Sequence, residues 1–433
     1  MKKVLTFSLL AALLSMAACN KTAAPESKEA PAVSAENGML IVSVVPNDGA
    51  KATKADGNAS TVTSESAITS LQVFVFHDQT DPALGHTAGN KETDRYQVFD
   101  GTDATRTLVL TTTVGMKRVY AVANAPRLTN VTTENDLKSR VLNLGNNYLT
   151  ATSVGSESRR GLIMAGAYGY TSGDAAINVT ATPKEIGAYT QGNDATITSV
   201  PISLHRLSAR IELQNINVNF KNTWMEGLTF TVKEIYLMNV PNGVYFTGQN
   251  AALLSTAGYW TNKHTLDATM TDNAGNGVSS LIYELRPSGG TVCNNAGSDT
   301  SIGSYFYSFP NPSTAVPTSA AASTWSQRRT NLVIHAQISG SNATLGTDYS
   351  TPQDTWYAFP IADPKNFVTS GSSTPSTSAT HSEIVGNHKY VIGKVNITGM
   401  GGPFPPSPQS SGKASIEVTV QDWNGTTVLG YDL

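Results

Sequence analysis

The chain has 433 residues and a formal net charge of −3, with 29 Lys and Arg against 32 Asp and Glu. This balance provides no broad basic surface for a phosphate backbone, so nucleic acid is excluded as the expected partner. Charged residues make up only 14%, and with 36 Gly and 20 Pro the composition is typical of a β-rich chain with many turns, better suited to an extracellular structural or binding module than to a helical enzyme.

The amino terminus predicts export. A short basic start at Met1–Lys3 precedes an apolar run from Val4 to Leu14, which is too short to span a bilayer, so residues 1–18 are expected to be a signal peptide. Small residues before Cys19 resemble the bacterial lipobox, in which that cysteine receives lipid. The alternative is ordinary signal peptidase cleavage after Ala18.

A tether and a first strand follow the signal. Residues 20–36 have almost no large apolar side chains and are expected to be an unordered tether. Met39–Val45 is a nearly continuous apolar run, as in a strand buried on both faces. The small, polar stretch after it contains Lys51 and Lys54, each followed by alanine and open to a trypsin-like protease.

The rest of the chain is a succession of short apolar or alternating runs, which predicts β-sandwiches rather than βαβ units. The predicted strands are 71–76, 107–111, 119–123, 197–204, 209–213, 216–220, 230–237, 244–246, 281–285, 305–309, 332–338, 356–361, 390–397 and 416–420. One helix is expected, because Thr133–Asp136 forms a capping box and Leu137, Val141 and Leu144 follow at helical spacing. The predicted domains are 55–205 and 206–433.

No local pattern predicts catalysis, a cofactor or a metal site. The seven histidines form no zinc-type cluster, and His381-Ser382-Glu383 is one loose pair of little specificity. Strand alternation predicts that His335 lies on a solvent-facing side as a bystander. Cys293, the only other cysteine besides Cys19, is expected to be an inert loop residue; if Cys19 carries lipid, no intrachain disulfide can form.

Several motifs occur in an order that resembles the fimbrillins, the FimA-like subunits of type V pili, and the resemblance covers nearly the whole chain. The motifs are Ile68–Asp78, Lys117–Pro126 with its Asn-Ala-Pro end, Gly161–Gly166, Leu204–Ile211, Tyr390–Gly399 and Ile416–Trp423. The resemblance implies an all-β protein of two transthyretin-like β-sandwich domains with few short helices. It also implies export as a lipoprotein and a place in a cell-surface fimbrium.

The resemblance further implies a maturation step. Fimbrillins lose their first strand when an arginine-specific or trypsin-like protease cuts the loop after it, and a strand from another subunit fills the vacated groove. Here residues 19–54 would be the propeptide, Leu40, Val42 and Val44 would belong to the displaced strand, and a cut after Lys54 would leave Ala55 first. The first arginine of this chain is Arg95, so a lysine-cutting or broad protease is required, and Lys51 remains an alternative cut site.

Two carboxyl-terminal segments are candidates for the donated strand. Ile416, Val418 and Val420 alternate on one side of the first segment, and three buried aliphatic anchors would contribute about 5 to 9 kcal/mol. The alternative is that this strand only completes its own domain. The second candidate lies further along and includes Val428, Leu429 and Tyr431.

The sequence therefore predicts a structural pilin, a shaft subunit that joins other copies of itself and accessory pilins. Its further expected partners are a trypsin-like maturation protease, the outer membrane through lipid on Cys19 before cleavage, and host or bacterial surface ligands in adhesion. The alternatives are a tip or anchor subunit, or a glycan-binding surface adhesin. An enzyme is a distant third reading.

Overall fold

The computed structural model describes residues 37–47, 65–82, 84–101, 103–143, 162–169, 175–187, 200–238, 240–241, 243–246, 259–260, 284–285, 290–311, 329–342, 346–362, 367, 383–403 and 413–422. The predicted signal peptide, Cys19, Lys51, Lys54, Ala55 and the segment with Val428, Leu429 and Tyr431 lie outside these residues. Within the described residues the fold is all-β with one short α-helix, as the sequence predicted.

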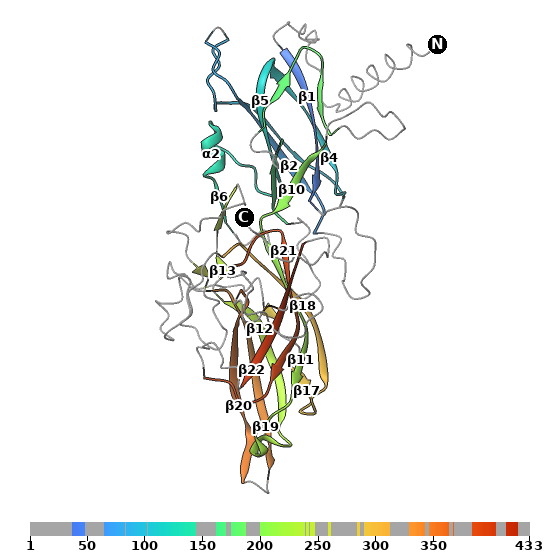
Figure 1. The fold of residues 1–433 in the computed structure, drawn as a ribbon, viewed down its shortest axis with the longest axis vertical. Helices are drawn as coiled ribbons and strands as arrows, with labels where there is room; N and C mark the ends of the chain where they lie inside the picture. The colour runs from blue at the N-terminus through green and yellow to red at the C-terminus, as the bar shows by residue number, and fades with distance from the viewer. Residues whose placement is uncertain are drawn as a thin grey trace, which may run out of the picture.

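The amino-terminal half forms one nine-stranded sheet, seen in the upper part of Figure 1. Its main path runs β3-β2-β5-β7-β10-β1-β4, with β8 paired to β5 and β9 paired to β1. The strands are β1 (Asn37–Pro46), β2 (Ser70–His77), β3 (Lys91–Val98), β4 (Arg106–Thr113), β5 (Gly115–Ala123), β7 (Met164–Ala167), β8 (Ile177–Val179), β9 (Lys184–Ile186) and β10 (Ile202–Arg206). The sheet encloses an aliphatic core drawn from most of these strands.

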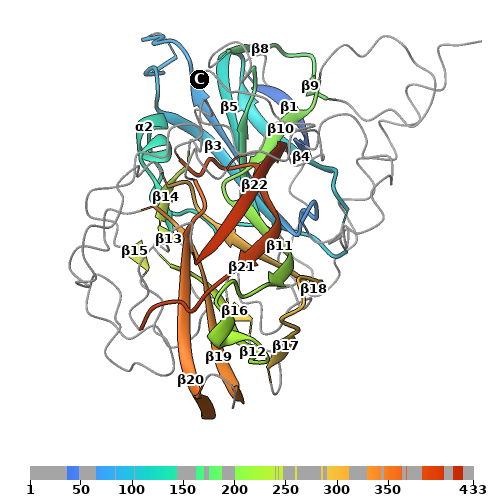
Figure 2. The ribbon, with the colours of Figure 1, turned by 60° about the horizontal axis from the view of Figure 1, so that its bottom comes forward.

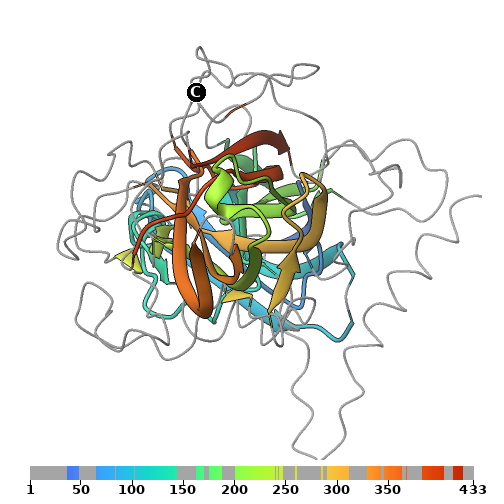
Figure 3. The same cartoon turned by 90° about the horizontal axis from the view of Figure 1, so that it is seen from below.

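The carboxyl-terminal half is a sandwich of two sheets, seen from below in Figure 3. One sheet has the order β18-β11-β21-β22, and the other has the order β16-β12-β19-β20 with β17 paired to β12. The strands are β11 (Ala209–Val218), β12 (Thr229–Met238), β16 (Glu284–Leu285), β17 (Thr291–Cys293), β18 (Asp299–Ser308), β19 (Asn331–Asn342), β20 (Thr347–Pro360), β21 (His388–Ile397) and β22 (Ala414–Asp422). The core between the sheets contains large aromatic residues such as Phe230 and Tyr357.

Short elements lie between or beside the two halves. They are β6 (Val141–Asn143), paired with β14 (Gly243–Tyr245), β13 (Val240–Pro241), paired with β15 (Tyr259–Trp260), and a 3-10 turn at Thr223–Met225. The chain passes from the first sheet to the carboxyl-terminal sheets between Arg206 and Ala209. The core of the carboxyl-terminal half continues across this junction, where the rings of Tyr120 and Phe246 lie 6.2 Å apart.

Two local predictions need correction. The helix α2 (Glu134–Lys138) begins at the predicted capping box but ends before Val141, because Val141–Asn143 pairs as β6 with β14 instead of continuing the helix. Long-range strand pairing here overrides the helical spacing of apolar residues. The two strands predicted between residues 209 and 220 are one strand, β11, with an irregularity between Leu213 and Asn215.

Candidate functional site

β1 is the first strand of the described residues but occupies an interior place in its sheet (Figure 1). One side pairs antiparallel with β4, from Asn37 opposite Thr113 to Val44 opposite Arg106. The other side pairs in parallel with β9 along Leu40–Val42 and with β10 along Val44–Pro46. Removing β1 would therefore leave unpaired backbone groups on both sides of a gap one strand wide.

The inward face of β1 fills this gap with aliphatic side chains. Leu40, Val42 and Val44, which the family resemblance assigned to the displaced strand, are fully buried. They pack in one cluster with side chains from every neighbouring strand, among them Val73, Val75, Leu108, Leu110, Val119, Val179, Ile186, Ile202 and Leu204. The apolar run thus indicated a buried strand, although no local signal in the sequence could show which strands would flank it.

The outward face of β1 is different in character. Met39 is 41% exposed, and the Ser43 hydroxyl lies 2.8 Å from that of Thr107 on β4. The strand is therefore buried mainly on one face, whereas the sequence predicted burial on both. The continuous apolar run misled here because apolar side chains are common on exposed protein surface.

Both ends of the gap are defined by specific contacts. At the start of β1, a Cβ added to Gly38 would lie 2.6 Å from Cγ1 of Val179 and 2.9 Å from the carbonyl oxygen of Thr180. At the other end the amide of Asn47 donates to the carbonyl of Leu204 at 2.7 Å, and its side-chain Nδ2 lies 2.9 Å from Nδ1 of His205. The groove is therefore closed to side chains at one end and polar at the other.

His205 is electrostatically suited to remain neutral in this position. Burial lowers the pKa of His205, and the neighbouring Arg206 guanidinium lowers it further. A neutral ring can accept a hydrogen bond from the Asn47 amide on Nδ1, which a protonated ring cannot do. The end of β1 is thus held in part by an uncharged histidine.

Glu65, where the described chain resumes after Asn47, makes contacts with both halves of the molecule. The Glu65 carboxylate lies 3.1 Å from Nη1 of Arg210 on β11 and also accepts the hydroxyl of Tyr307 on β18. Nε of the buried Arg206 donates to the Glu65 carbonyl at 3.1 Å. This buried cluster fixes the chain just after the predicted cut site, and no pairwise sequence spacing could have revealed it.

The first carboxyl-terminal candidate is incorporated in its own domain. β22 pairs antiparallel with β21, and Ile416, Val418 and Val420 are buried in the carboxyl-terminal core (Figure 2). This placement corresponds to the alternative in which the segment completes its own sandwich.

Other sequence candidates are structural in the described residues. His335 is 3% exposed rather than solvent-facing, because Glu234 and Asp354 bracket its two ring nitrogens and Trp356 stacks on it at 4.4 Å. Cys293 ends a short strand rather than lying in a loop, and burial raises the pKa of its thiol. Throughout the described chain, no three His, Cys, Asp or Glu side chains are grouped so as to hold a metal ion.

The described residues contain no helix with the length and apolar character needed to cross a membrane.

Comparison with known proteins gives matches in sequence and in structure. Residues 40–206, which run from β1 to the end of β10, match the family model of the major fimbrial subunit protein FimA. A curated relative from Parabacteroides distasonis, named as a candidate fimbrium tip subunit, Fim1C, is 24% identical over 243 residues. That match covers 54% of this chain and 56% of the relative, so it spans little more than half of the relative's length.

Solved structures share the fold over most of the chain. A fimbrilin from Porphyromonas gingivalis has a TM-score of 0.59 at 17% identity, covering 92% of this chain and 100% of that one. A candidate cell adhesion protein from Bacteroides eggerthii has a TM-score of 0.53 at 21% identity, covering 90% of this chain and 96% of that one. The family match contains every strand that borders the gap around β1, which makes the amino-terminal half of this chain similar to the major fimbrial subunit protein FimA.

Proposed function

We propose that this chain is a structural pilin, a shaft subunit of a cell-surface fimbrium that polymerises by exchange of its first strand. The precursor is exported as a lipoprotein through Cys19, trimmed after Lys54 so that Ala55 becomes the first residue, and assembled into an adhesive fibre. The observation that carries this proposal is the interior position of β1, immediately before the segment that contains Lys51 and Lys54. The proposal assigns no catalytic step to the chain.

The energetics of the gap favour refilling. Without β1, the β4 side and the β9 and β10 side would expose backbone donors and acceptors together with an aliphatic core, which makes an edge prone to pairing with another strand. Three buried aliphatic side chains on the incoming strand would each contribute about 1.5 to 3 kcal/mol. Backbone pairing would add to this, so another subunit is an effective replacement for the lost strand.

The donated strand is assigned to the segment that includes Val428, Leu429 and Tyr431. β22 is already paired with β21, and withdrawing it would expose Ile416, Val418 and Val420 from their own core. Donating the later segment leaves that sandwich intact. The partners in the fibre are other copies of this chain and accessory pilins, with host or bacterial surface ligands contacted by the finished fibre.

A tip subunit is the second candidate, because the curated relative Fim1C is named as a candidate fimbrium tip subunit. A tip subunit needs a groove that accepts a strand but needs no donated strand of its own. An anchor subunit would instead keep Cys19 and its first strand. The carboxyl-terminal segment therefore distinguishes shaft from tip, and the amino terminus distinguishes both from an anchor.

The first test is the intact mass and amino-terminal sequence of protein sheared from the cells that make it. A start at Ala55, or at Ala52 if Lys51 is cut, supports removal of β1. A population that begins at lipid-modified Cys19 contradicts the proposal and favours the anchor, or a glycan-binding surface adhesin, which a glycan array would then test. Substituting Lys51 and Lys54 by Ala one at a time assigns the cut.

The second test is deletion of residues 428–433. A shaft subunit should keep its folded monomer but lose the ladder of polymers seen on unheated gels. Leu429→Asp should reproduce this loss, whereas Thr426→Asp outside the deleted segment is the matched control. Polymers that persist after the deletion would exclude donation by this segment and favour the tip reading if the protein is found only at fibre ends.

A further inference from the structure

β4 is held in the sheet differently from the other strands that border the gap. It stands at the end of the strand order, and β1 is its only ladder partner within the described residues. Removing β1 would remove every backbone ladder contact that β4 makes between Arg106 and Thr113. Any groove that accepts a strand there needs some other means of keeping β4 in place.

Side chains on the far side of β4 supply bonds that do not involve β1. Nη1 of Arg95 on β3 donates to the carbonyl of Val109 at 2.6 Å, in the middle of β4. The Glu92 carboxylate, also on β3, accepts the backbone N–H of Thr113 at the end of β4. β3 therefore holds β4 by side-chain bonds where the sheet has no backbone ladder between them.

Glu92 is itself fixed by a buried partner. Its carboxylate lies 2.6 Å from Nζ of Lys117 on β5, whose side chain is 1% exposed. Hydrogen bonds from Lys117 and from the Thr113 backbone outweigh burial and lower the pKa of Glu92, so the group is a carboxylate at neutral pH. The end of β4 is thereby connected to β5 through a charged pair on β3 and β5.

The opposite end of β4 is held by its own first residue. Arg106 donates from Nε to the carbonyl of Ile68 and from Nη2 to that of Asp100, each at 3.0 Å. Its Nη1 lies 2.7 Å from the Asp103 carboxylate, and the guanidinium lies 4.7 Å from the centre of the Phe99 ring. These contacts are with the segments on either side of β2 and β3, not with β1.

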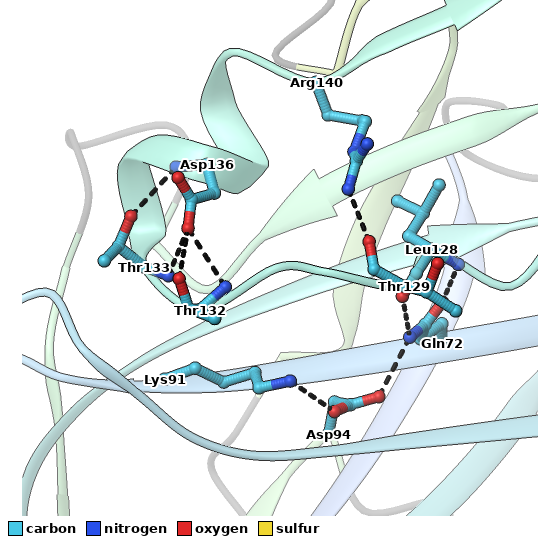
Figure 4. Close-up of polar contacts among 9 residues, drawn as sticks. All are labelled: Gln72, Lys91, Asp94, Leu128, Thr129, Thr132, Thr133, Asp136 and Arg140. Carbon is cyan, nitrogen blue, oxygen red and sulfur yellow. Dashed lines mark hydrogen bonds and ion pairs between the residues drawn. The ribbon is translucent and has the colours of Figure 1, made fainter.

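β3 can act as a firm support because it is bonded to its neighbours by more than a ladder. The buried Gln72 on β2 donates to Asp94 at 2.9 Å and to the carbonyl of Leu128 at 3.1 Å, and Asp94 pairs with Lys91 at 2.9 Å (Figure 4). β3 therefore has fixed positions from which Glu92 and Arg95 reach β4.

We propose that Glu92, Arg95 and Arg106 are positioning residues that keep β4 in place as one wall of the groove once β1 has left. This inference rests on the proposed strand exchange and adds the groups that keep the acceptor open. Two walls must stay roughly 9.5 Å apart, twice the spacing of neighbouring strands, to receive a new strand. If β4 moved toward β10, the aliphatic row beneath would be covered and the groove would close.

The test uses Arg95→Ala in the full chain, expressed in cells that assemble the fibre. Loss of one charged hydrogen bond should reduce polymer yield in the sheared fraction about tenfold. The thermal midpoint of the precursor should remain unchanged, since β1 still holds β4 there. Lys184→Ala, which removes an exposed cation from β9 on the other wall, is the matched control and should leave polymer yield unchanged.

Hydrogen exchange gives the readout that a general structural role would not change. In the Arg95→Ala precursor, amides of residues 107–113 should exchange at the same rate as in the wild-type precursor. In the trimmed Arg95→Ala monomer they should exchange faster than in the trimmed wild-type monomer. Polymer yield equal to the Lys184→Ala control, or an equal loss of stability in precursor and trimmed protein, would overturn the inference. If Arg95→Ala does not fold, Arg95→Lys should fold and restore part of the yield, and failure of both also overturns it.

Polymer yields of the 428–433 deletion and of Arg95→Ala, taken together, distinguish a failure of the positioning role from a failure of the proposed strand exchange. Polymers that survive deletion of residues 428–433 would remove the assigned donor regardless of what Arg95 does. Polymers lost on that deletion but unaffected by Arg95→Ala would leave the strand exchange standing and remove only the positioning role.

Discussion

The first and last described strands each bury a row of three aliphatic side chains but have different places in the molecule. β1 carries Leu40, Val42 and Val44 in one buried row, and β22 carries Ile416, Val418 and Val420 in another. β1 lies in the interior of its sheet, between β4 on one side and β9 and β10 on the other, whereas β22 stands at the end of its sheet beside β21. The two strands therefore bury the same kind of aliphatic row at different positions in their sheets.

The largest expected effect tests this difference directly. Leu40→Ala and Ile416→Ala each delete a buried aliphatic side chain and should lower the unfolding free energy of the precursor by about 2 to 5 kcal/mol. If β1 is discarded, only Ile416→Ala should destabilise the trimmed subunit. Denaturant unfolding of precursor and sheared protein measures both, and an equal effect of Leu40→Ala in the two forms would mean that β1 is retained.

The next effect compares glycines near the two strands. Gly38→Ala in β1 would place Cβ within 2.6 Å of Val179 and should destabilise the precursor by about 1 to 3 kcal/mol. Gly393→Ala in β21, beside β22, would place Cβ 3.9 Å from the nearest atom and should be close to neutral. Equal thermal midpoints for the two variants would show that the Val179 side of the groove yields readily.

A smaller effect is expected on the outward face of β1. Ser43→Ala removes the hydroxyl that lies 2.8 Å from that of Thr107 and should cost about 0.5 to 1.5 kcal/mol in the precursor. A double-mutant cycle with Thr107→Ala isolates the pair. Additive losses would show that the two hydroxyls contribute independently rather than to each other.

The smallest effect should appear as a dependence on pH. Because burial and Arg206 lower the pKa of His205 below its ordinary value of 6.5, the folded precursor binds fewer protons there than the unfolded chain. The stabilising contribution of the neutral ring is therefore fully present above the ordinary pKa of 6.5. It is lost as the pH falls from there through the lower pKa of the folded state. Denaturation midpoints from about pH 8 to about pH 5 should fall less steeply in His205→Gln. An unchanged slope would mean that His205 does not contribute.

Much of the fold could be predicted because it depends on patterns within short windows. A continuous apolar run indicated β1, strand alternation identified the buried row of β22, and the Thr133 capping box located the start of α2. The end of α2 could not be predicted, since Val141 pairs with Tyr245 about a hundred positions later. His335 was misplaced for the same reason, because the strand that brings Glu234 to it comes 101 positions earlier in the chain.

The candidate site divides in the same way. The row of Leu40, Val42 and Val44 and the lysines after it are visible in the sequence as an apolar run and a polar one. The walls of the groove are not, because β4, β9 and β10 are assembled from positions scattered over most of the first half of the chain. Likewise, nothing near Arg95 in the sequence indicates that its side chain reaches the backbone of β4.

The parallel pairing of β1 with β10 also determines the order in which this protein can fold. Val44 is among the earliest residues of the described chain to leave a ribosome or an export channel, yet its partner Ile202 follows roughly 160 positions later. A contact between such distant positions requires closure of a long loop, which makes this step slow compared with hairpins such as β19 and β20. We expect β1, the strand that the proposed maturation would remove, to be one of the last parts of the amino-terminal half to reach its place. This order would leave a folding intermediate with an open groove before any proteolysis.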